Sequence, residues 1–425
     1  MTEIETPVEL PLLAAPRNPK IVMVEDQESL DAAVRDLAAN SGPFALDAER
    51  ASGFKYSARA YLVQVARGNS AIYLIDPFAI APEVNAEPFR GLAELLTTDT
   101  WILHAATQDL ACLAELGLKP TSLFDTELGG RIAGFPRVGL GAMCESQLGY
   151  RLAKEHSAVD WSTRPMLADW LNYAALDVDV LAELMEAVRT SLEEQGKSEY
   201  ARQEFEHLLN FSPKGPKIDR WRSLNGLHEV KDAKRLAIAR DLWSARESLA
   251  QKLDVSPGRL IPDASIVAVV KDAPKSRSEM AARKDFHGRA SRTYLDTWWK
   301  ALETGLNTLD LPPVKLANTG IPNHRSWPNR FPEADARLTK LKPVMSALSQ
   351  EYNIPAENLL TPDFVRQLAW LPPQEITAES VSQALLDSGA RSWQAEICSG
   401  RFAVALLATN PVEPGLEPSD LDLNV

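Results

Sequence analysis

The sequence has few cysteines and no long apolar run. Its 425 residues include three cysteines, Cys112, Cys144 and Cys398, whose wide spacing supports neither a disulfide framework nor a zinc knuckle. No apolar stretch approaches the roughly 20 residues that cross a bilayer. The first 20 residues also lack a basic start followed by an apolar core. We therefore expect a cytoplasmic protein without a membrane partner.

The composition is globular but the charge is unevenly distributed. Hydrophobic residues make up 45% and charged residues 24% of the chain, and the net charge is −13. Residues 1–210 hold 17 Lys and Arg against 32 Asp and Glu, residues 211–330 hold 22 against 13, and residues 331–425 hold 6 against 13. The overall acidity argues against nucleic acid, but the basic middle segment has the electrostatic footprint of a phosphate-binding domain.

Strand and helix patterns divide the chain into an α/β domain and two helical domains. From residue 20, strand patterns over 21–24, 44–49, 61–66, 71–76 and 101–104 are interleaved with helical patterns, such as 27–39 and a long stretch over 168–206. This predicts a mixed sheet with helices. After residue 217 the apolar residues recur at helical spacing. We predict a flexible tail at 1–19, the α/β domain at 20–211, linkers at 212–219 and 305–330, helical domains at 220–304 and 331–411, and an acidic tail at 412–425.

The two helical domains contain a weak internal repeat. Pro257 to Asp263 resembles Pro355 to Asp363, and each run follows a long helical pattern and precedes shorter ones. We therefore predict two small bundles of one kind.

Acidic side chains recur at defined places in the α/β domain. Asp47 and Glu49 alternate with apolar residues, so they share one face of a strand, where two carboxylates repel each other unless a cation holds them. Asp109 falls in the first turn of a helix after the 101–104 strand, with Thr107 as the expected N-cap. The four-residue step from Tyr173 to Asp177 places both on one side of a helix.

Singly, each of these acids is best explained as a solvated charge. Together, four carboxylates can supply two divalent cations with hard oxygen ligands, and their four negative charges balance the ions. Two such ions roughly 3.5–4 Å apart stabilise both the attacking and the departing oxygen of a displacement at phosphorus. The pattern therefore indicates metal-dependent phosphoryl chemistry.

These residues resemble a known family, ribonuclease D, whose members are DEDDy-type 3′-5′ exonucleases with C-terminal HRDC domains. The resemblance rests on Leu46 to Glu49, Arg59, Gln64, His104 to Leu110, Phe124 to Thr126, Asp160 to Pro165 and Tyr173 to Val178, and spans about residues 20–205. It implies a ribonuclease H-like exonuclease fold followed by two HRDC-type bundles. Two positions depart from the family pattern: Ala48 replaces the usual Thr, and Tyr56 to Arg59 replaces a Tyr-Tyr-Pro-like run.

The resemblance also implies an activity. Asp47, Glu49, Asp109 and Asp177 would hold two Mg²⁺ or Mn²⁺ ions, and Tyr173 would orient the attacking water or help to deprotonate it. Nucleoside 5′-monophosphates would be released from the 3′ ends of RNA such as tRNA precursors, by a protein that we expect to be a monomer. The candidate substrate contacts are Phe54, Tyr56, Arg59, Gln64 and Arg164.

Several of these residues have alternative interpretations. Phe54 and Tyr56 could stack on terminal bases or be ordinary loop aromatics, and Arg164 could hold a phosphate or serve packing. His104 fits a core position, and Asp125 fits a helix cap, better than a metal ligand. Two other functions remain as alternatives, a DNA-directed exonuclease of the same superfamily and a non-catalytic RNA-binding scaffold.

Overall fold

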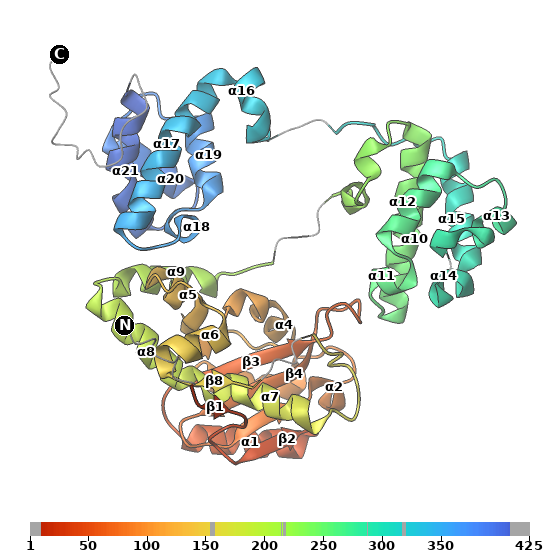
Figure 1. The fold of residues 1–425 in the computed structure, drawn as a ribbon. Coiled ribbons are helices and arrows are strands. Elements are labelled where there is room, and N and C mark those ends of the chain that lie inside the picture. The colour runs from red at the N-terminus through yellow and green to blue at the C-terminus, as the bar shows by residue number, and fades with distance from the viewer. Residues whose placement is uncertain are drawn as a thin grey trace, which may run out of the picture.

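The computed structural model describes residues 10–153, 158–213, 215, 218–286, 288–316 and 320–408. They form an α/β domain and two helical bundles (Figure 1). The predicted acidic tail at 412–425, the first nine residues of the predicted N-terminal tail and part of the 212–219 linker lie outside the described residues.

A six-stranded mixed sheet organises the α/β domain, as predicted. Its order is β2-β5-β4-β3-β6-β7, and β4 alone runs antiparallel to its neighbours. The strands are β2 (Ile21–Val24), β3 (Phe44–Arg50), β4 (Ala60–Arg67), β5 (Ile72–Ile75), β6 (Trp101–Leu103) and β7 (Leu123–Asp125). The β3 strand lies inside the sheet, where β4 and β6 pair with its two edges.

Helices cover the two faces of this sheet. They are α1 (Gln27–Ala39), α2 (Pro77–Ile80), α3 (Arg90–Leu96), α4 (Leu110–Glu115), α5 (Thr126–Ile132), α6 (Leu140–Met143), α7 (Ala168–Asp179), α8 (Leu181–Glu194) and α9 (Ser198–Leu209). Phe44 and Leu46 pack with residues of α1, α3 and α4 on one face. Ala45 packs with residues of α7 on the other face, which is the face that Asp47 and Glu49 share.

Two predictions about this domain are wrong in detail. The long helical stretch is three helices, because the chain leaves the helical hydrogen-bonding pattern at Val180 and again near Gly196, whose φ is +67°. The C-terminal part of the predicted flexible tail at 1–19 is bound to the α/β domain. Residues Leu12–Leu13 (β1) pair in parallel with Arg151–Leu152 (β8), and the backbone N–H of Arg17 donates to Asp179 at 2.9 Å.

The first bundle has a core of its own. It contains α10 (Ala233–Leu253), α11 (Pro257–Leu260), α12 (Asp263–Asp272), α13 (Arg277–Ala282), α14 (Arg289–Thr293) and α15 (Leu295–Asn307). Leu236 and Leu242 of α10 pack with Trp298 of α15. Because α15 continues to Asn307, the second linker begins after the predicted residue 305.

The second bundle contains α16 (Trp327–Arg330), α17 (Pro332–Glu351), α18 (Ala356–Leu359), α19 (Pro362–Trp370), α20 (Ala378–Asp387) and α21 (Ser392–Leu407). The residues of α16 were predicted to be linker. They belong to the bundle because Trp327 is fully buried in its core. The internal repeat is visible in the structure, since α11 and α18 each join a helix of about 20 residues to a shorter one.

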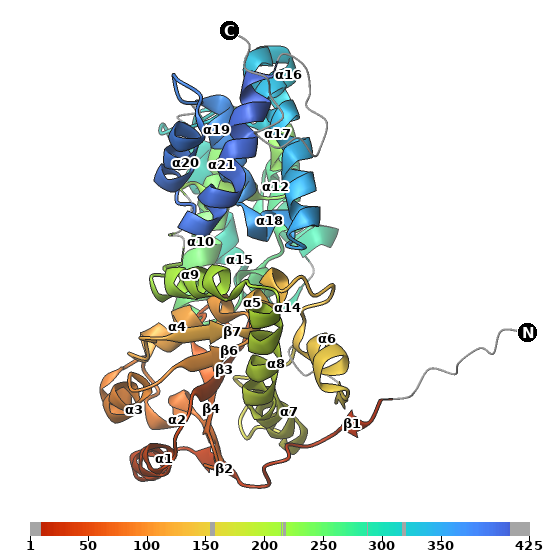
Figure 2. The same cartoon turned by 90° about the vertical axis from the view of Figure 1, so that its left-hand side faces the viewer.

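The second bundle shares its core with the α/β domain. One continuous apolar cluster joins Val188 of α8 and Phe205 of α9 to residues of α17, α19 and α21. Figure 2 shows α21 and α18 lying over α9 and α5. The contact is also polar, because Arg391 donates to both oxygens of the buried Glu204 at 2.6 and 2.7 Å.

No helix among the described residues has both the length and the apolarity needed to traverse a lipid bilayer.

Candidate active site

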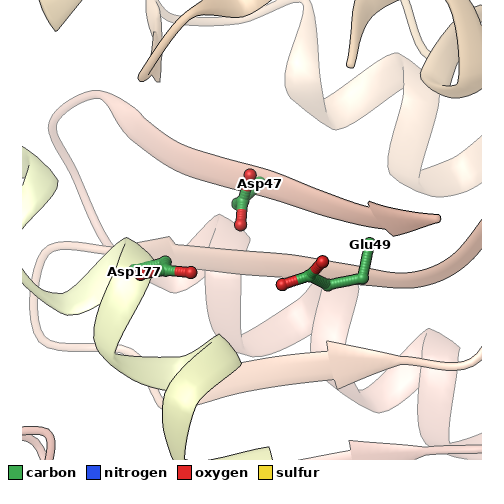
Figure 3. Close-up of side chains that lie close together, drawn as sticks. All are labelled: Asp47, Glu49 and Asp177. Atoms are coloured by element: carbon green, nitrogen blue, oxygen red, sulfur yellow. The ribbon is translucent and has the colours of Figure 1, made fainter. Parts of the chain in front are cut away.

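Three of the predicted carboxylates converge at the end of β3. Asp47 and Glu49 project from β3 and Asp177 from α7, and one oxygen of each lies within 4.8 Å of the others. Figure 3 shows the three side chains pointing toward one another. Glu49 and Asp177 are each 8% exposed. The strand alternation and the helix face predicted from the sequence therefore bring these acids together.

Asp109 lies in the same cleft, outside this tight group of three. It is 4% exposed and lines a cleft of about 700 Å³ together with Asp47, Glu49 and Asp177. Its charge interacts with those of Asp47 and Asp177.

A sharp turn delivers Asp109 to the cleft. Ala105 has φ of +61°, and a short 3₁₀ turn over Ala106–Gln108 follows before α4 begins. The N-cap of α4 is Asp109, not the predicted Thr107. The side chain of Asp109 makes no cap hydrogen bond, so its carboxylate remains directed to the cleft.

Asp125 stabilises this turn from the neighbouring strand. Its Oδ1 accepts hydrogen bonds from the N–H groups of Glu127 and Leu128, which makes it the N-cap of α5, as predicted. The same carboxylate also accepts from Ala105 at 3.0 Å and from Ala106 at 2.9 Å. One buried acid therefore caps a helix and fixes the left-handed residue before Asp109.

Mutual repulsion and burial perturb the clustered acids. Burial raises the pKa of Glu49 to about 10, and the charges of Asp47, Asp177 and Asp109 add to this effect. Burial also raises the pKa of Asp47 to about 6, and the pKa of Asp109 rises well above its usual range. Burial therefore disfavours the charged forms of Asp47, Glu49 and Asp109, and a cation bound among them would stabilise those forms.

Tyr173 faces the same carboxylates. Burial raises its pKa above the usual value for a phenol, and the negative charge of Asp177 raises it further. A hydrogen bond joins its hydroxyl to Asp177, and its ring lies 6.4 Å from that of Trp161. Tyr173 is therefore held as a neutral hydrogen-bonding group.

His104 is not a ligand for a cation in this arrangement. Its Nδ1 lies 2.8 Å from Oγ1 of Thr126, and burial lowers its pKa to about 4. It borders the cleft as a neutral side chain, consistent with the core position expected from the sequence.

The predicted stacking aromatics contact the first bundle. The guanidinium of Arg259 lies 4.1 Å from the centre of the Phe54 ring, and Tyr56 packs against the core of that bundle. The backbone of the same loop is held as well, because Ser256 donates to the carbonyl of Phe54 at 2.9 Å and Asp254 accepts from Ser57 at 2.9 Å. In this structure both aromatics therefore lie in the contact between the α/β domain and the first bundle, which local sequence could not reveal.

The structure also gives Arg164 a packing role. All five of its N–H donors are used: two bind Asp76, at 2.6 and 2.8 Å, and three bind the carbonyls of Tyr61, Trp161 and Thr163. These contacts favour the packing alternative for Arg164 over a phosphate contact.

Arg59 and Gln64 do not line the cleft either. Arg59 donates to the carbonyl of Pro82 at 2.8 Å and lies over the ring of Phe78. Gln64 is fully buried and pairs across the strands with Asp47, so it lies beside the acids on the sheet face that they share.

The structure adds cleft residues that the sequence patterns did not single out. Arg50, Arg137 and Glu145 border the cleft together with the acids. Arg50 directly follows Glu49, but strict alternation would place it on the opposite face. Arg50 borders the cleft from the last position of β3, where the pairing with β4 shifts register: Glu49 pairs with Leu62 and Arg50 with Ala60, so the extra residue, Tyr61, is on β4.

Comparison with known families agrees with this geometry. A family model described as "3'-5' exonuclease" matches residues 21–193, which include all four acids and Tyr173. An HRDC domain model matches residues 235–302 in the first bundle. The second bundle, over residues 320–406, matches a model described as "3' to 5' exonuclease C-terminal domain".

Individual proteins resemble the chain over most of its length. A ribonuclease D of Granulibacter bethesdensis is 28% identical over 312 residues, which cover 71% of this chain and 74% of that protein. A crystal structure of a protein from Bifidobacterium adolescentis is 33% identical, with a TM-score of 0.84 over 94% of this chain and all of that one. Escherichia coli RNase D, at 23% identity, shares the fold, with a TM-score of 0.63 over 86% of this chain and 98% of its own.

The fold and the acidic cleft define a 3′-5′ exonuclease domain followed by an HRDC domain. With its second C-terminal bundle and its curated relatives, the protein is ribonuclease D-like.

Proposed function

We propose that the protein is a metal-dependent 3′-5′ exoribonuclease. It removes nucleotides from the 3′ ends of RNA, of the tRNA-precursor type, in the cytoplasm and as a monomer. The observation that carries the proposal is the convergence of Asp47, Glu49 and Asp177 within 4.8 Å, in a cleft that also contains Asp109.

The carboxylates suit two Mg²⁺ or Mn²⁺ ions. They are hard oxygen donors in a common cleft, and burial raises the pKa values of Glu49 and Asp109, so a bound cation would stabilise the ionised forms. Asp47, Glu49, Asp109 and Asp177 would hold the ions. When bound, such ions neutralise the acids, activate water and stabilise the charge that develops on the phosphodiester.

The reaction is hydrolysis of the terminal phosphodiester. The oxygen of water forms a bond to phosphorus, and the bond from phosphorus to the 3′ oxygen of the preceding nucleotide breaks. One proton of the water ends on the departing 3′ oxygen. Tyr173 would position the water through its hydroxyl. Its raised pKa disfavours a role as proton acceptor, so we assign it to orientation.

RNA is the proposed substrate because the curated relatives are ribonucleases D. The basic segment 211–330, with 22 Lys and Arg against 13 Asp and Glu, includes the first bundle and supports contact with RNA phosphates. The contact of Tyr56 with that bundle brings this basic domain against the loop that leads from the β3 acids.

Digestion of 3′-labelled RNA and single-stranded DNA tests the proposal. We expect release of nucleoside 5′-monophosphates from RNA only with Mg²⁺ or Mn²⁺, near-complete loss in Asp177→Asn and a partial loss in Tyr173→Phe. Asp169→Asn, on the same helix and remote from the acids, is the matched control. Cleavage without divalent ions, or full activity in Asp177→Asn, would exclude this mechanism, and a preference for DNA would exclude the ribonuclease assignment.

A further inference from the structure

Among the described residues, two arginines line the cleft, and their surroundings differ. Arg137 lies 3.7 Å from Glu145, and its side chain is 74% exposed. Arg50 is half-buried. Across the described parts of the chain, its guanidinium has no hydrogen-bonding or ion-pair partner, although it lies in the field of the acids. Arg50 is therefore a cation whose donors are not used within the protein.

Backbone geometry brings Arg50 to the cleft. It is the last residue of β3, and it pairs with Ala60 after the register shift that follows Glu49. The extra residue at this shift is Tyr61 on β4, so the irregularity lies in the partner strand where β3 ends, and such irregularities are common beside active sites. At this end of β3, Arg50 lines the same cleft as Asp47 and Glu49, which precede it on the strand.

The electrostatic role of Arg50 depends on what neutralises the acids. The positive charge of Arg50 lowers the pKa values of Asp47, Glu49 and Asp109 against the larger effect of burial. The four carboxylates carry four negative charges, which balance the four positive charges of two divalent cations. With such ions bound, the acids no longer neutralise the positive charge of Arg50. A guanidinium with unused N–H donors in a polar cleft is suited to a phosphate, which it can bind through two parallel hydrogen bonds.

We propose that Arg50 binds a non-bridging phosphate oxygen of the substrate at or next to the scissile bond. This deepens the proposed function and rests on it. Arg50 thereby contributes a third positive group to the charge that grows on phosphorus during hydrolysis, in addition to the cations that the acids hold.

The test compares Arg50→Gln and Arg50→Lys with the wild type. Arg35→Gln is the matched control, because Arg35 is an exposed arginine on α1, on the other face of the sheet. The measurements are kcat and KM on a 3′-labelled RNA with Mn²⁺, the affinity for Mn²⁺ without RNA, and the affinity for the same RNA with Ca²⁺. Thermal melting verifies that all variants are folded.

We expect Arg50→Gln to reduce kcat/KM on the order of 100-fold, Arg50→Lys to recover part of this loss, and Arg35→Gln to match the wild type. The affinity of Arg50→Gln for Mn²⁺ should be unchanged or higher, because a neighbouring positive charge is removed. Wild-type kcat/KM in Arg50→Gln would overturn the proposal. So would weaker Mn²⁺ binding with full recovery of activity at high Mn²⁺, since Arg50 would then act on the acids alone.

Failure of the proposed function has a different signature. In that case the wild type itself does not cleave RNA with metal ions. The Arg50 contact is then decided by the Ca²⁺ binding experiment, where equal RNA affinities of the wild type and Arg50→Gln would refute it and weaker binding by Arg50→Gln would support it.

Discussion

The carboxylate of Asp125 holds the turn that delivers Asp109, so its removal should affect both stability and activity. Four backbone N–H groups donate to it at 2.9 to 3.1 Å, and the side chain is 3% exposed. In Asp125→Ala, losing a helix cap costs about 1 kcal/mol. Leaving the buried N–H groups of Ala105 and Ala106 unpaired costs about 1–3 kcal/mol each. The expected local destabilisation is therefore about 3–7 kcal/mol.

Asp125→Asn should be milder, because the asparagine oxygen can replace Oδ1, which accepts three of the four hydrogen bonds. Only the N–H of Ala106 then faces an amide nitrogen, at a cost of about 1–3 kcal/mol. Asp26→Ala is the matched control. Asp26 caps α1 in the same way, but it is exposed and anchors no second turn.

Amide hydrogen exchange is the appropriate assay, because a chain of three domains need not unfold in one step. Protection of the Ala105 and Ala106 amides should fall by several orders of magnitude in Asp125→Ala and by less in Asp125→Asn. Exonuclease activity should also fall more in Asp125→Ala than in Asp125→Asn, because the turn positions Asp109 in the cleft. Unchanged protection of these two amides, with wild-type activity, would refute the anchoring role of Asp125.

Three further predictions concern other parts of the molecule. Glu204→Gln should destabilise the contact with the second bundle by about 3–5 kcal/mol, because it removes the negative charge that pairs with Arg391 and places an amide nitrogen against one of the N–H donors of Arg391. A melting temperature no lower than that of the surface variant Glu199→Gln would contradict this. Asp254→Ala should increase proteolytic cutting within residues 51–59 by about fivefold, since it removes about 1 kcal/mol of hydrogen bonding to that loop. Equal rates of cutting in the variant and the wild type would show that contacts other than those of Asp254 hold the loop. The affinity for Mn²⁺ should rise with pH between 6 and 9, because Glu49, whose pKa is raised to about 10, must lose its proton to bind the ion. Calorimetry in buffers of different ionisation enthalpy should detect the released proton. A pH-independent affinity would contradict the prediction.

The acids could be predicted from the sequence because each depends on local geometry. Alternation along a strand places Asp47 and Glu49 on one face, and the four-residue step of a helix pairs Tyr173 with Asp177. The resemblance to ribonuclease D then assigned all of them to one site. The mixed sheet and the two helical bundles were likewise predictable, since they follow from the change of apolar period along the chain.

What could not be predicted depends on long-range contacts and on backbone irregularities. Phe54 and Tyr56 appear in sequence as loop aromatics near the site, and their contacts come from residues about 200 positions away. Arg164 forms its ion pair with Asp76, 88 residues earlier. Arg50 reaches the cleft where the strand register shifts, which residue types alone do not specify.

The shared core between the α/β domain and the second bundle has a consequence for dissecting the protein. A fragment ending at residue 330 would expose Val188, Phe205 and their apolar neighbours to water. Such a patch promotes aggregation. The nuclease module should therefore be expressed together with residues 331–408, whereas the intervening HRDC bundle, which has its own core, is the natural segment to delete.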